Sequence, residues 1–572
     1  MKVFPHFTTG IISNSDDRVP SVLSSLGLNI SSKRHGPAAG PEMDRRNGAF
    51  NIDFVAMSYD VGFSKPAPEI FNAALHLSGQ EVLAETQLIH VGDDIEQDYH
   101  GRTSTCDKWD LRTELIIKFL RSVLSAPSPR GALAQQRSTL VDPGIKGRIW
   151  ISKVTFPPPP EVHSALDLLC KAIDQLKEDY AAIYEVPATL PVEAEWTGFR
   201  PNVDAQRQRS DLSEQQHYEK LQADVQNPLT ILYFHGGAYI MMDPATHREP
   251  VSKLCRLTGG RALNVRYRLV PQNPFPAALL DALIAYLSLL HPPPGSYHEL
   301  VDPSHIVLAG DSAGGHLSIS LIQLLLQINR DSVRNSRASF DFHGSKISLP
   351  LPLPAGSASA SPWLDMTHCM PSEFSNGQYD YLPPPLTKER VSKWPADTIW
   401  PTKPPRGDLF CNTNLLNHPL VSPAGAKDWT GAPPIWMGYG TEMLVDGGKQ
   451  VASRMAKQGV KVQWEQWEAM CHCFGMVLLQ TDMSRHFFKD WAEAIKGMTG
   501  LDLASGARTF DGVQTKAVLF GIHASKETGK ETRLSLETLA VMSDEEADAR
   551  MKSAVQARKD NPKLAEQVTP KL

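Results

Sequence analysis

The stretch that most constrains this sequence is residues 305–315, HIVLAGDSAGG. Its first half is a β-rich apolar run that predicts a buried strand, and the apolar residues 316–326 predict a helix directly after it. Gly310 and Gly314 lie two residues on either side of Ser312. Small residues are needed at those positions where a strand turns sharply into a helix. The stretch predicts an α/β fold with Ser312 exposed at the turn, and a purely structural serine is the alternative.

A second stretch, residues 229–239 (LTILYFHGGAY), predicts a short buried strand that ends abruptly in His235, Gly236 and Gly237. Consecutive glycines allow a sharp turn and leave the backbone N–H groups unobstructed. Such groups can point at negative charge that develops on a reacting oxygen. A simple glycine turn is the alternative interpretation.

Two further loops carry groups that can activate a serine, whose hydroxyl is a weak nucleophile without a base. His472 follows a predicted strand at residues 460–467 and is the candidate base. A predicted strand at residues 434–440 is followed by Glu442 and Asp446, and either carboxylate is well placed to orient an imidazole.

In this order, HGGAY, NVRYRLVPQNPFPAALLDA (residues 264–282), GDSAGG, SPWLDM (residues 361–366) and a final His-x-Phe resemble the hormone-sensitive-lipase-like branch of the α/β-hydrolases. The resemblance covers about residues 145–500. It implies an α/β-hydrolase sheet flanked by helices, with a cap over the pocket. It also implies a serine carboxylesterase or lipase that needs no metal and no cofactor.

Carried over by position, the resemblance makes Ser312 the nucleophile and His472 the general base. It makes the N–H groups of Gly236, Gly237 and Ala313 the oxyanion hole.

The acid departs from the family pattern, which is acid-x-Leu-x-Asp with an aspartate first. This chain has Glu442 at that first position, and a glutamate can do the same orienting work with a longer arm. The pattern favours Glu442 as the triad acid and leaves Asp446 as the alternative.

The first 105 residues resemble a different family. A strand ending in Ser13, a Ser-Lys-Pro at Lys65 and a strand ending in Asp93 and Asp94 are similar to motifs of the haloacid-dehalogenase-like hydrolases. The resemblance implies a partial Rossmann-like fragment in which Ser13 and Lys65 contact a phosphate and the two aspartates help hold Mg²⁺. No acidic residue precedes Ser13 to serve as that family's nucleophile. We expect an inactive fragment, and Mg²⁺-dependent phosphatase activity is the alternative.

The composition limits the partners. The net charge of −6, from 57 basic and 63 acidic residues, gives no electrostatic reason to expect nucleic acid or an anionic membrane. Seven scattered cysteines argue against a disulfide framework and fit a reducing compartment. No stretch resembles a signal peptide or approaches the roughly 20 apolar residues that span a bilayer. These features predict a soluble, cytoplasmic protein.

We predict three regions, namely the fragment 1–105, a hydrolase domain 106–500 and a tail 501–572. The tail is expected to be partly helical or disordered. Its segment SDEEADARMKSAVQA begins with Ser543 as a helix N-cap. The thin apolar stripe of that segment predicts an exposed helix.

Segments 109–125, 162–180 and 370–425 are candidates for the pocket walls. They carry Trp, Phe, Leu and Pro, which favours a small-molecule ester with an apolar acyl or alcohol group. A hydrolase fold that only binds ligands, without catalysis, is the remaining alternative.

Overall fold

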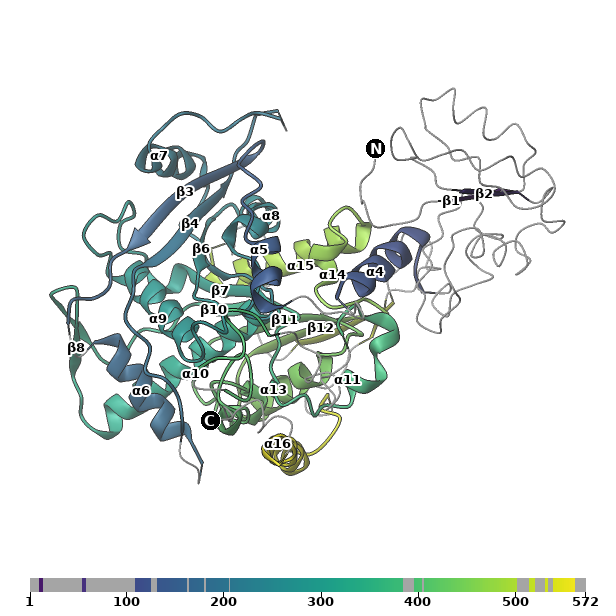
Figure 1. Ribbon diagram of the computed structural model, residues 1–572. Helices are drawn as coiled ribbons and strands as arrows, with labels where there is room; N and C mark the ends of the chain where they lie inside the picture. Colours follow the sequence, from purple (N-terminus) through teal and green to yellow (C-terminus); the bar gives the residue numbers. More distant parts are fainter. Residues whose placement is uncertain are drawn as a thin grey trace. The chain divides into compact units, whose positions relative to one another are not determined.

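The computed structural model describes residues 10–13, 54–57, 108–124, 131–161, 164–178, 182–204, 206–383, 396–403, 406–501, 514–519, 530–532 and 539–560 (Figure 1). The chain forms two compact units, residues 1–122 and 123–572.

The first unit contains a pair of parallel strands, β1 (Gly10–Ser13) and β2 (Phe54–Met57). Helix α4 (Leu111–Leu124) begins in the same unit. Its first turn is capped by Asp110, whose Oδ1 accepts the N–H of Thr113 at 2.7 Å.

The second unit is built on a ten-stranded sheet in the order β14-β13-β12-β11-β10-β7-β5-β6-β4-β3. Neighbours from β6 through β13 are parallel, whereas β4 is antiparallel to both β3 and β6, and β14 is antiparallel to β13. The strand bounds are β3 (Ile149–Phe156), β4 (Val192–Phe199), β5 (Thr230–Phe234), β6 (Arg261–Arg266), β7 (Ile306–Asp311), β10 (Gly356–Ala360), β11 (Ile435–Gly440), β12 (Val462–Trp467), β13 (Gln514–Leu519) and β14 (Lys530–Thr532). A separate hairpin joins β8 (Ser339–Phe342) to β9 (Ser345–Ser348).

Helices cover both faces of this sheet, which confirms the α/β fold predicted from the sequence. Helices α8 and α15 pack against each other on one face, while α9, α10 and α13 lie on the other (Figure 1). The helix bounds are α5 (Ala132–Thr139), α6 (Ala165–Leu176), α7 (Glu214–Asp224), α8 (Arg248–Thr258), α9 (Ala277–Leu290), α10 (Ala313–Arg334), α11 (Ser372–Ser375), α13 (Val445–Lys457), α14 (Phe474–Val477), α15 (Asp482–Thr499) and α16 (Asp544–Lys559). Within the described residues, no helix combines the length and the apolar character needed to cross a bilayer.

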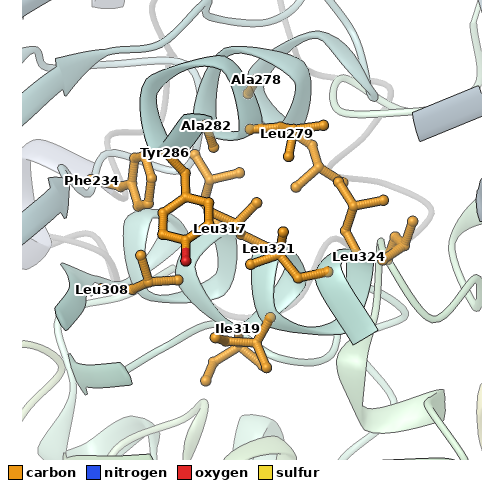
Figure 2. Packing of buried hydrophobic residues seen from close by; sticks show 14 of the residues in the cluster. Phe234, Ala278, Leu279, Ala282, Tyr286, Leu308, Leu317, Ile319, Leu321 and Leu324 are labelled. Carbon is orange, nitrogen blue, oxygen red and sulfur yellow. The ribbon is translucent and has the colours of Figure 1, made fainter. Parts of the chain in front are cut away.

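Part of the buried core lies between α9 and α10. Every residue of α9 is buried, as expected of a helix that is apolar all round. Figure 2 shows Leu279 and Tyr286 of α9 beside Leu317 and Leu321 of α10, with Leu308 of β7 next to them. This packing fixes β7 and α10 on either side of the turn at Ser312, because close-packed interiors resist small displacements.

In helix α16 the predicted N-cap is present, but the helix is not fully exposed as predicted. Ser543 Oγ accepts the N–H of Glu546 at 3.1 Å. One face of the helix is nevertheless buried, through Ala547, Met551 and Val555. The guanidinium of buried Arg454 in α13 bonds the carboxylates of Asp544, at 2.9 Å, and Asp548, at 2.7 Å. The helix is therefore held by an apolar face and by a buried arginine of α13 that bonds its first turns.

The prediction that segment 162–180 forms a pocket wall is also not supported. Helix α6 does not lie at the carboxyl ends of the strands but along the far part of α10. There Lys171 Nζ pairs with Asp331 at 2.7 Å, and Gln175 Nε2 donates to the same carboxylate at 2.5 Å. The apolar residues of this segment serve the core rather than the pocket.

Docking of α16 can be tested with two substitutions on that helix. Met551→Ala leaves a cavity under the helix and should lower the free energy of unfolding by about 2–3 kcal/mol. Arg550→Ala removes only an exposed ion pair with Glu546 and should cost less than about 0.5 kcal/mol. Chemical denaturation followed by circular dichroism measures both. Equal effects of the two substitutions would contradict the docked arrangement.

Candidate active site

Ser312 lies between the end of β7 and the start of α10, as the sequence predicts. Its backbone has φ 51° and ψ −118°, a conformation that L-residues rarely adopt. The strain persists because its own groups are bonded on both sides. Its N–H donates to the Ala360 carbonyl at 3.0 Å, and its carbonyl accepts the N–H of Trp363 at 3.1 Å.

The two flanking glycines are required by a close approach of backbones. A Cβ on Gly314 would lie 1.9 Å from the carbonyl oxygen of Phe234 in β5. A Cβ on Gly310 would lie 2.6 Å from the same oxygen and 2.5 Å from the carbonyl carbon of Gly314. The turn therefore exists only with glycine at both positions.

His472 and Glu442 are brought together from two adjacent strands. His472 follows β12 and Glu442 follows β11, and both side chains are buried. The Nδ1 of His472 bonds Glu442 Oε1 at 2.8 Å. A carboxylate can only accept, so Nδ1 carries a proton, and in the neutral ring Nε2 keeps its lone pair.

The second oxygen of Glu442 is also occupied. Oε2 accepts the hydroxyl of Ser361 at 2.6 Å and the N–H of Gly440 at 3.1 Å. Ser361 Oγ in turn accepts the N–H of Cys473 at 3.0 Å. The carboxylate is thus held in one orientation by His472, by Ser361 and by the end of β11.

Asp446 plays a different part. It lies in the first turn of α13, where its carboxylate accepts the N–H of Ser372 at 2.9 Å and pairs with Lys449 at 3.1 Å. Of the two carboxylates that the sequence left open, Glu442 is the one bonded to His472.

The other ring nitrogen of His472 faces a thiol. Nε2 lies 3.5 Å from the Sγ of Cys473, which is buried and has a positive φ of 49°. Within the described residues, the Ser312 hydroxyl makes no hydrogen bond to His472. Hydrogen bonds of catalytic groups are often long before substrate binds and tighten afterwards.

The electrostatics favour a charged pair. Burial alone lowers the pKa of His472, but the Cys473 sulfur and the Glu442 carboxylate raise it well above the usual histidine range. Burial raises the pKa of Glu442, and the adjacent imidazole opposes that rise. The carboxylate therefore stabilises the imidazolium form of His472.

The glycine turn after β5 contains two of the three predicted oxyanion-hole donors, and the prediction for Gly236 is not supported. The N–H of Gly236 donates to Asp311 Oδ1 at 3.1 Å and is not free for another acceptor. The N–H groups of Gly237, Ala238 and Ala313 bond no acceptor within the described residues. Ala238 directly follows the two glycines and was not among the predicted donors.

Asp311 is the centre of a buried network behind the serine. Besides Gly236, its carboxylate accepts the hydroxyl of Tyr233 at 2.8 Å and contacts His247 Nε2 at 3.4 Å. Burial alone would raise the pKa of Asp311, but His247 and Tyr233 lower it. This network fixes the glycine turn against the turn at Ser312.

The N-terminal residues singled out for phosphate and Mg²⁺ lie largely outside the described residues. Ser13 is the last residue of β1, whereas Lys65, Asp93 and Asp94 fall in the ranges that the structure does not describe. In the described ranges, no group of three or more His, Cys, Asp or Glu residues is arranged to hold a metal ion.

The family described as alpha/beta hydrolase fold matches residues 231–476. An acetyl-hydrolase of Streptomyces hygroscopicus is 32% identical over 248 residues, which are 43% of this chain and 68% of that protein. An esterase of Acinetobacter venetianus is 26% identical, over 50% of this chain and 79% of that protein.

Among solved structures, an esterase from the bacterial hormone-sensitive lipase family is similar, with 22% identity and a TM-score of 0.44. The similarity covers 68% of this chain and 99% of that protein.

Substitution separates the two candidate acids. Glu442→Gln removes the charge opposite His472 and should lower kcat for ester hydrolysis by about 10⁴-fold, the loss expected when a triad acid becomes an amide. Asp446→Asn should change kcat by less than about threefold, since the Asp446 carboxylate bonds Ser372 and Lys449 rather than His472. The assignment is wrong if only the Asp446 variant loses activity.

The bond between His472 and Glu442 also predicts how ester hydrolysis depends on pH. A base must be neutral, so hydrolysis rises with pH through the pKa of His472. The rising limb of kcat/KM should therefore lie above the ordinary histidine pKa of about 6.5. In Glu442→Gln, loss of the carboxylate lowers that pKa, and the limb should move to lower pH. A limb at the same pH in both proteins would contradict the charge coupling.

Proposed function

The chain belongs to the alpha/beta hydrolase fold family, and on that premise we propose that it hydrolyses carboxylic esters by a serine mechanism. Ser312 is the nucleophile, His472 the general base and Glu442 the acid. The observation that carries the proposal is the strained turn at Ser312, at the carboxyl end of β7, together with the 2.8 Å bond between His472 and Glu442. A relative named as an acetyl-hydrolase and another named as an esterase support the reaction class.

The first half-reaction forms an acyl-enzyme. His472 Nε2 takes the proton of Ser312 Oγ as that oxygen attacks the ester carbonyl carbon. The imidazolium then donates the same proton to the alkoxide oxygen, and the alcohol leaves. Glu442 remains ionised throughout and stabilises the imidazolium.

The second half-reaction repeats these steps with water. Nε2 removes a proton from water, and the resulting oxygen nucleophile attacks the acyl carbon. The carboxylic acid leaves as the proton returns to Ser312 Oγ. No redox change or cofactor is needed for the atoms to balance.

Backbone donors stabilise the tetrahedral intermediates. We assign this role to the N–H groups of Gly237, Ala238 and Ala313, which lie on the two turns that flank the serine. Loss of one such donor typically costs about 10²–10³ in rate. Gly236 is excluded, because its N–H already bonds Asp311.

An apolar group on the substrate fits the surroundings of the base. The ring of Tyr381 lies 6.1 Å from the ring of His472, between centroids, and comes from the Pro-rich segment that the sequence suggested as a pocket wall. An aromatic side chain beside the base favours an apolar acyl or alcohol group over a charged one.

A panel of nitrophenyl esters with short to long acyl chains tests the proposal. Ser312→Ala should lower kcat by about 10⁶-fold, as for a lost serine nucleophile. Ser332→Ala is the matched control, because Ser332 is buried on the same helix and its hydroxyl bonds only a helix carbonyl at 2.8 Å. Its kcat should be unchanged. Unchanged hydrolysis in Ser312→Ala would reject the mechanism, and no hydrolysis by the unmodified protein would favour a binding role.

A further inference from the structure

A buried carboxylate that takes no part in the proposed chemistry lies between the loops of the acid and the base. Asp380 follows a short 3₁₀ turn, η4 (Gly377–Tyr379), and is 1% exposed. Its Oδ2 accepts the N–H of Met443 at 2.8 Å, and its Oδ1 accepts the N–H of His472 at 3.2 Å. One side chain therefore bonds the backbone of the base and that of the residue after the acid.

The peptide group between Glu442 and Met443 is held at its other end as well. Asn376 Nδ2 donates to the carbonyl oxygen of Glu442 at 3.0 Å. Asp380 accepts the N–H of the same peptide group. A peptide plane bonded at both polar groups cannot rotate without breaking one of these two bonds in the interior. Residues 376–380 thus set the direction in which the Glu442 side chain leaves the backbone.

The carboxylate that makes these bonds is itself fixed. Asp380 Oδ1 also accepts the N–H of Tyr381 at 2.8 Å and that of Leu382 at 3.3 Å. Nearby, Ser372 Oγ donates to the carbonyl of Met443 at 2.6 Å. The loop that contains Glu442 and Met443 is therefore held by residues 372–380. Asp380 in that segment is itself fixed by bonds from the next two residues.

We propose that Asp380 is a positioning residue that sets the distance and angle between Glu442 and His472. It acts through those two residues and not on the reacting atoms, and the inference rests on the proposed function. The two loops come from different strands, and their side chains must meet in one geometry. A displacement of about 1 Å in such a geometry can cost about 100-fold in rate.

Asp380→Asn keeps the size of the side chain but replaces one acceptor oxygen by an amide group that faces a backbone N–H. The expected result is a kcat lower by about 100-fold, with KM within about threefold of the unmodified protein. Asn376→Ala removes the bond to the Glu442 carbonyl, together with an exposed bond from the Ser375 hydroxyl, at a half-buried position. It should lower kcat by about tenfold, the factor for one lost hydrogen bond.

A double substitution distinguishes positioning from a merely structural role. If Asp380 acts through Glu442, then Asp380→Asn should lower kcat by less than about tenfold in the Glu442→Gln background, because residues that act as a unit are not additive. A structural role predicts the same factor in both backgrounds.

Asp365→Asn is the matched control. Asp365 is 3% exposed and bonds the N–H groups of Thr367, at 2.8 Å, and Cys369, at 3.1 Å, within its own loop. Its substitution should lower the Tm without changing kcat.

Three results would overturn the positioning role. These are an unchanged kcat in both Asp380→Asn and Asn376→Ala, an undiminished factor in the Glu442→Gln background, or an equal loss of kcat in Asp365→Asn. The proposed function fails separately, if Ser312→Ala still hydrolyses the esters.

Discussion

The contact on which the site depends is the close approach of the α10 backbone to the end of β5. Only the absence of a side chain at Gly314 lets the helix begin against the carbonyl of Phe234. That approach forces the sharp turn at Ser312 and its strained backbone. Dense packing between α9 and α10 holds the elements in place, so the strain cannot relax by a shift of the helix.

Around that turn, buried acceptors fix each loop that contributes to the site. Asp311 holds the glycine turn through Gly236, and Ser361 joins Glu442 to the loop of the base. Asp380 bonds the loops of the acid and the base. Each acceptor satisfies a backbone N–H that would otherwise be unpaired in the interior, so fold stability and site geometry rest on the same bonds.

The sequence predicted the parts of the site that depend on local chemistry. The run from strand to glycine, serine, glycine and helix places Ser312, because the close approach demands those residue types. His472 and Glu442 followed from loops after predicted strands. Gly236 was assigned wrongly, because its partner Asp311 lies 75 residues away and no local pattern indicates which N–H groups remain free.

Long-range contacts also account for the other differences. Docking of α16 depends on Arg454, which its own sequence does not reveal. Asp380 lies in a Pro-rich stretch without periodicity, and its role appears only when three loops meet. The Ser-Pro-Trp motif at residue 361 entered only as part of a resemblance, whereas its serine bonds the acid directly.

The central claim is that Ser312 is a nucleophile activated by His472. The most direct measurement treats the full-length protein with a fluorophosphonate probe and locates the adduct by mass spectrometry of the digested chain. The account predicts one adduct, on Ser312, that forms at least about 10³-fold more slowly in His472→Ala. The absence of an adduct on Ser312, or labelling at the same rate in His472→Ala, would contradict it.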